Sequence, residues 1–63
     1  MNNWDIITTL KDAGATNDEP GWTAIDAVFA LLSGHVTRDE ALAALRTGGV
    51  HEPERALKEV EGC

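Results

Sequence analysis

Cysteine is almost absent from this sequence: Cys63 is the only one, so no disulfide can form within the chain. With His35 and His51 it makes up the whole set of soft metal ligands. Paired zinc ligands are usually about two to four residues apart, and no two of these three are that close. We therefore expect no metal and no cofactor, and a reducing, intracellular location. A terminal thiol that acts between molecules, as in a thiol carrier, stays an alternative.

Basic residues are also few. Five Lys and Arg stand against eleven Asp and Glu, which gives a net charge of −6. Residues 1–33 hold five of the acids and only one base, Lys11. Because binding to a phosphate backbone depends on clustered Lys and Arg, we expect no direct contact with nucleic acid. A larger protein with a basic groove is the electrostatically favoured partner.

Long apolar runs are missing as well. The longest, AVFALL at Ala27–Leu32, is far too short to span a bilayer, and no basic start precedes an apolar stretch. We expect a cytoplasmic protein that is neither secreted by a standard signal nor anchored in a membrane.

Catalytic motifs are not found either. The turn-rich stretch GATNDEPG, residues 14–21, carries acids where a phosphate loop needs backbone donors and a lysine. A nucleophile needs a base and an orienting group in a preformed pocket, and a chain of this length buries only about 60% of its unfolded surface. We expect no cleft large enough for catalysis without a partner, and no enzyme.

What the sequence does contain is helical periodicity. We predict an all-α fold, a small orthogonal bundle of three to four helices in a single domain, residues 1–63. The helices are expected at about 4–13, 22–33, 38–47 and 53–61. Asn3 is the expected cap of the first helix and Gly14 its end, and residues 14–21 are the expected linker. Pro53 suits the first turn of the last helix.

The helix at 22–33 is the most hydrophobic, so we expect it to be central and covered on most sides. In the first helix, the expected apolar side holds Trp4, Ile7 and Leu10 with Ile6 and Ala13. The strongest local signal is Thr37 followed by Glu40, the spacing of a capping box that starts a helix.

The segment GHVTRDEALAAL also permits two functional interpretations. With Glu40 as the last ligand of a calcium loop, the first ligand positions fall on Phe29, Leu31 and Ser33, which cannot hold a hard cation. As a DNA-reading helix-turn-helix, its second helix carries four glutamates against Arg55 and Lys58. A capped helical hairpin explains the same residues and is favoured.

Trp4 and Trp22 lie on either side of the acidic linker and are two of only three aromatic residues. Packing in the core from helix ends is the more common role for such residues, and anchoring an interface is the alternative. We select Trp22 as the candidate anchor. The candidate partner-binding set is Trp22, Asp12, Asp18, Glu19 and Asp26.

Two segments resemble known families. ALAALRTGGVHEPERALKEV resembles the last two helices of ubiquitin-associated domains, which implies an adaptor that binds ubiquitin-like proteins, although SGHVT stands at the loop that carries that family's Met-Gly-Phe-like contact. AIDAVFALLSGHVTRDEALAAL is similar to the ending of small antitoxins that inhibit Fic-domain toxins. In that family's inhibitory motif, Thr8 and Asp12 take the places of the Ser or Thr and of the Glu.

From these observations we predict a small acidic protein-binding module that inhibits or modulates a larger protein, as an inhibitor, an antitoxin or an accessory subunit. If the partner's groove holds nucleic acid, the module would act as a charge mimic. The alternatives are a self-associating structural protein, with a homodimer as its simplest form, and an adaptor of the ubiquitin-associated kind.

Overall fold

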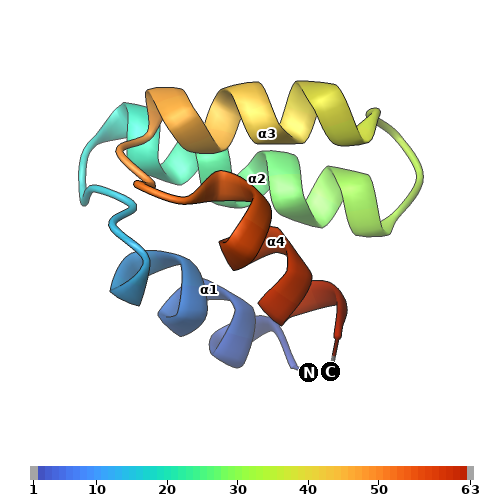
Figure 1. The fold of residues 1–63 in the computed structure, drawn as a ribbon, viewed down its shortest axis with the longest axis horizontal. Helices are drawn as coiled ribbons and strands as arrows, with labels where there is room; N and C mark the ends of the chain where they lie inside the picture. The colour runs from blue at the N-terminus through green and yellow to red at the C-terminus, as the bar shows by residue number, and fades with distance from the viewer. Residues whose placement is uncertain (1, 63) are drawn as a thin grey trace.

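The computed structural model describes residues 2–62, which form four α-helices joined by short turns (Figure 1). They are α1 (Asn3–Asp12), α2 (Glu19–Leu32), α3 (Arg38–Thr47) and α4 (Pro53–Glu61). No strand occurs among these residues. The predicted all-α bundle is confirmed, with four helices rather than three. Cys63 lies outside the described residues.

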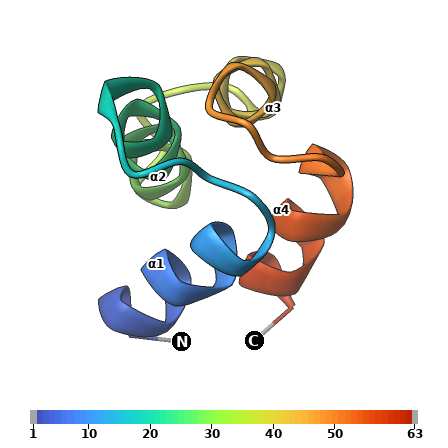
Figure 2. The ribbon, with the colours of Figure 1, turned by 90° about the vertical axis from the view of Figure 1, so that its left-hand side faces the viewer.

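The helices follow one another around a common core, as the end-on view shows (Figure 2). α2 and α3 run antiparallel and pack together more extensively than any other pair, and α4 runs obliquely to both (Figure 1). α4 also packs on α3 and on α1, whereas α1 and α2 do not pack together to a comparable extent. One side of the bundle, between α1 and α2, is therefore less tightly closed than the others.

The core is small but complete. Every helix contributes to it, and the α1–α2 and α3–α4 linkers each add one residue, Ala15 and Val50. The accessible surface of 3909 Å² equals the roughly 3,900 Å² expected of a folded monomer of this mass. The fully buried large side chains are Leu10, Ile25, Val28, Leu45 and Leu57.

α1 differs from the sequence prediction in its cap and in its buried face. The side chain of Asn2, not Asn3, accepts a hydrogen bond from the backbone N–H of Asp5 at 2.8 Å. Ile6 and Leu10 face the core, while Trp4 is 73% exposed. Trp4 and Ile6 are two residues apart, about 200° around a helix, so they cannot share one face. The prediction that Trp4 belongs to the buried side was wrong.

α2 begins three residues earlier than predicted, at Glu19 instead of Trp22. Pro20 fits the first turn because its missing N–H would have no partner there. Gly21 is buried inside the helix, so only residues 14–18 of the predicted linker are non-helical. The turn signal was misleading because Pro and Gly are also tolerated in a first helical turn.

α2 is covered along most of its circumference, as expected, but two of its large apolar side chains are partly exposed. Ala24, Ile25 and Val28 face the core, but Trp22 is 44% exposed and Leu32 is 48% exposed. Trp22 lies on the exposed side of α2, whereas Leu32 is seven residues after Ile25 and stands in the last turn of the helix.

The predicted capping box at the start of α3 is confirmed. The Thr37 hydroxyl accepts the backbone N–H of Glu40 at 3.2 Å, and the Glu40 carboxylate accepts the backbone N–H of Thr37 at 3.3 Å. Two N–H groups that the helix cannot pair by itself are satisfied in this way.

We expect Thr37→Ala to lower the free energy of unfolding by about 1 kcal/mol, because one backbone donor of α3 loses its acceptor. Urea denaturation followed by circular dichroism measures the change. Thr37→Ser keeps the hydroxyl and should be near wild type, and Thr23→Ala, at an exposed position within α2, serves as the control. Equal stability of Thr37→Ala and wild type would contradict a stabilising cap.

The α1–α2 and α3–α4 linkers lie against each other and close the core. The backbone N–H of Thr16 donates to the carbonyl of Gly48 at 3.0 Å, and that of His51 donates to Ala13 at 3.4 Å. His35 and His51 are exposed in turns, as predicted.

Candidate functional site

Trp22 lies on the exposed side of the first half of α2, and a lysine from α1 holds it in place. The Lys11 ammonium lies 4.3 Å from the centre of the indole ring, a cation–π contact. Lys11 also donates a hydrogen bond to the Asn17 side chain, which ties the linker to the same group. The ring is thus 44% exposed and contacts Lys11 on one face, an interaction worth about 0.5–1 kcal/mol at such a site.

Two carboxylates flank this ring along α2. Asp18, the residue before the helix, and Asp26 stand four positions before and after Trp22, the spacing that puts residues on one side of a helix. Both are exposed. The Asp18 carboxylate accepts a hydrogen bond from the Thr16 hydroxyl, which fixes its orientation. The structure therefore brings together three of the five candidate residues: Trp22, Asp18 and Asp26.

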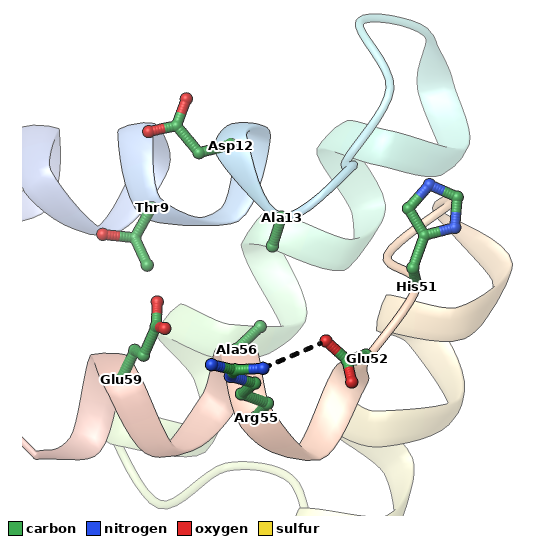
Figure 3. Close-up of a pocket in the computed structure, with 8 residues that line it drawn as sticks. All are labelled: Thr9, Asp12, Ala13, His51, Glu52, Arg55, Ala56 and Glu59. Atoms are coloured by element: carbon green, nitrogen blue, oxygen red, sulfur yellow. Dashed lines mark ion pairs between the residues drawn. The ribbon is translucent and has the colours of Figure 1, made fainter.

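The other two candidates point elsewhere. Asp12 follows Lys11 directly, so it lies about 100° further around α1 and is turned away from Trp22. It stands at the rim of a hollow between α1 and α4, with its side chain directed away from α4 (Figure 3). Glu19 lines a different hollow, of about 440 Å³, between α2 and α3. These two acids add to the charge of the front half but do not touch the Trp22 site.

The hollow between α1 and α4 has a volume of about 360 Å³. Thr9 and Ala13 of α1 face the α4 side chains across it, and Arg55 is paired with Glu52 at 3.6 Å (Figure 3). Polar residues at its edges are Asp12, His51, Glu52 and Glu59. Within residues 2–62, no three Asp, Glu, His or Cys side chains form a group that could hold a metal ion.

Sequence reasoning missed this hollow. Thr9 and Asp12 are polar residues of one helix, and nothing in their spacing indicates that α4 lies opposite Thr9. The sequence also gave no sign that Lys11 meets Trp22, because their separation of eleven residues crosses a linker of unknown geometry.

Apart from Lys11, the positive charges lie away from the Trp22 site. Arg46, Arg55 and Lys58 line a third hollow, of about 550 Å³, at the start of α4. Glu52 and Glu54 line it too, so this surface is mixed rather than basic. Arg38 pairs with Glu61, which joins α3 to the end of α4. Lys11 is the only lysine or arginine before Arg38, and it is already engaged with Trp22.

Neither tryptophan is part of the core. Core packing, the more common role, does not apply to either, because Trp4 is 73% and Trp22 44% exposed. Exposure is what an interface anchor requires. None of the helices within residues 2–62 is both long enough and apolar enough to cross a membrane.

Comparison of the chain with protein-family models, with curated proteins and with solved structures finds no match. Its function is therefore argued from the surface just described.

Proposed function

We propose that this chain is a small cytoplasmic protein-binding module whose acidic front half docks on a basic groove of a larger protein and inhibits or modulates it. Trp22 is the anchor, and Asp18 and Asp26 are the charges beside it. Asp12 and Glu19 contribute to the long-range field rather than to the contact itself.

The observation that carries this proposal is an exposed indole that is already held in place. Interfaces concentrate their binding energy in a few residues, and tryptophan is enriched among them. Ordering a mobile side chain on binding costs about 0.5–1.5 kcal/mol. The contact with Lys11 already limits the motion of the Trp22 ring, so less of this entropy is lost on binding. The Lys11–Trp22 contact of 4.3 Å is what distinguishes this surface from the exposed Trp4.

The charge distribution supports a basic partner. Five acids and a single lysine in residues 1–33 give this half a net charge of −4. Fields of this kind mainly raise the rate of association and select against acidic partners. Where the partner's groove ordinarily holds nucleic acid, the module would compete with it as a charge mimic, the mode of an inhibitor or antitoxin.

We expect Trp22→Ala to weaken binding to the partner by about 2 kcal/mol or more, which is roughly 30-fold in Kd. The partner is first isolated by affinity capture with mass spectrometry, and binding of the purified pair is then measured by calorimetry. Trp22→Phe, which keeps an aromatic ring, should lose less, and Thr23→Ala on the next residue is the control.

The dependence of the affinity on salt concentration is a second test of the same complex. Association should weaken as salt rises from about 0.05 to 0.5 M, because exposed charges become screened. The Asp18→Asn and Asp26→Asn double variant should bind more weakly and lose part of this dependence. If the affinity changes neither with salt concentration nor on substitution of Trp22, the proposal is contradicted.

Self-association is the alternative, and the exposed Trp4 and Leu32 are the features in its favour. Sedimentation equilibrium over a range of concentrations separates the two. A monomer that binds another protein fits a modulator, whereas a stable homodimer that buries Trp22 fits an assembly protein.

A further inference from the structure

The apolar side chains that the core leaves uncovered are not scattered, because they lie along the weakly closed side between α1 and α2. On α1, Trp4 and Lys11 are seven residues apart, two turns of helix, and therefore lie on one line. Lys11 reaches the ring of Trp22 on α2. Trp4 therefore lies on the same side of α1 as the lysine that contacts Trp22.

The same side continues along α2. Phe29 is seven residues after Trp22 and falls on the same line. Leu32, in the last turn of α2, lies about 80° around the helix from Trp22, and 48% of its surface is exposed. Phe29 is half-buried against the core, as is Ile7 on α1. We call the surface made by Trp4, Ile7, Lys11, Trp22, Phe29 and Leu32 the α1–α2 edge.

The dimensions of this edge suit a single helix. α1 has 10 residues and α2 has 14, so the two helices that bound the edge are about 15 and 21 Å long. Figure 2 shows α1 and α2 on one side of the bundle, with α3 and α4 on the other. An amphipathic helix that lays its apolar face on such a surface uses anchors at helical spacing over three to four turns, about 12–14 residues.

Charge decides which kind of helix fits. Two carboxylates, those of Asp18 and Asp26, stand beside Trp22 against the single ammonium of Lys11, and residues 1–33 carry a net charge of −4. A second copy of this chain would bring the same negative charge against itself across a symmetric contact. A helix whose apolar stripe is bordered by Lys and Arg meets both the exposed rings and the carboxylates.

We propose that the α1–α2 edge is the binding site for a basic amphipathic helix of the partner protein, with Trp4 and Leu32 as contacts in addition to Trp22. This inference rests on the proposed function and specifies the partner's chemistry: the basic element is a helix with an apolar stripe. It also extends the site beyond the acidic residues to the far end of α1.

The test uses synthetic peptides of about 14 residues, with leucines at i, i+3, i+4 and i+7 spacing and lysines on both sides of the stripe. One control peptide has the same composition in an order without an apolar face. Another has glutamate in place of lysine. Binding to the full chain is measured by calorimetry, and the site is located by amide chemical shifts. We expect the first peptide alone to bind, with shifts confined to α1 and α2.

Charge attraction by itself would let a basic peptide bind anywhere on an acidic protein, so neutral substitutions provide the decisive comparison. Trp4→Ala and Leu32→Ala leave the net charge unchanged and remove side chains that are mostly or half exposed. Each should weaken the peptide by about tenfold, which equals about 1.4 kcal/mol. Thr47→Ala, an exposed neutral position on α3, should have no effect. Circular dichroism verifies that each variant is folded.

The outcomes separate this inference from the proposed function. Peptide binding that is equal for wild type, Trp4→Ala and Leu32→Ala overturns the helix site, even if a natural partner still depends on Trp22. Edge-dependent peptide binding supports it, whatever the fate of the natural partner. A homodimer that Trp4→Ala dissociates would assign the edge to a second copy and overturn the inference as well.

Discussion

Replacing Gly21 by alanine is expected to destabilise the protein by about 3 kcal/mol, near the upper end of the usual overpacking cost. A Cβ atom at this position would lie 1.8 Å from the carbonyl oxygen of Thr16 and 2.7 Å from its backbone nitrogen. Both contacts are with backbone atoms, which cannot rotate aside as a side chain can. The linker would have to move away from α2.

Helix propensity by itself predicts the opposite result. Gly21 lies within α2, and alanine in place of glycine inside a helix normally stabilises it by about 1 kcal/mol. Whether Gly21→Ala raises or lowers the free energy of unfolding therefore tests directly whether the Thr16 backbone lies this close to Gly21. Urea denaturation provides the measurement, and unfolding free energies of about 3–9 kcal/mol are typical of a domain of this size. A loss of this magnitude would leave a visible unfolded fraction.

Gly34 is the matched control, because it separates backbone strain from collision. It has φ of +80°, and a Cβ there would meet nothing within 4 Å. Gly34→Ala should cost only the left-handed strain, about 1–2 kcal/mol. Gly21→Ala as stable as wild type, or less damaging than Gly34→Ala, would contradict the packing of the linker on α2.

The second large effect is expected at Leu57 of α4, which is completely buried. Leu57→Ala should lower the free energy of unfolding by about 2–5 kcal/mol, through lost burial and the cavity that remains. Urea denaturation should show a lower midpoint with an unchanged slope, since the area exposed on unfolding hardly changes. Leu57→Met nearly conserves the volume and should cost less than about 1.5 kcal/mol.

Leu32→Ala is the control for Leu57→Ala, because it makes the same chemical change at a residue that is 48% exposed. Its expected cost is under about 1 kcal/mol, since half the side chain already meets water. This difference also matters for the proposed helix site, where Leu32→Ala must remain folded. Equal losses at the two positions would mean that the core is not where the structure places it.

Part of the candidate site was predictable from the residues themselves. The acidic front half and the selection of Trp22 as anchor followed from charge counts and from the enrichment of tryptophan at interfaces. The structure places Asp18 and Asp26 with Trp22, as their spacing of four along one helix requires. Asp12 and Glu19 were grouped with them because they are near in sequence, and the helices direct them to other surfaces.

Local signals by themselves determined the helical class of this protein. The Thr37–Glu40 box starts α3, Gly14 and Gly34 follow α1 and α2 with positive φ, and leucines at helical spacing mark the core. These features depend on contacts within one or two turns, so the sequence contains all the information they need.

Only the tertiary structure decided which faces are covered. α1 has apolar residues on two sides, and α2 on nearly all of its circumference, so periodicity cannot select one face. The selection depends on how the helices cross: α1 packs more on α4 than on α2, Ile6 is buried and Trp4 remains outside. The Lys11–Trp22 contact and the α1–α2 edge exist for the same reason, since both depend on the path of the linker between those helices.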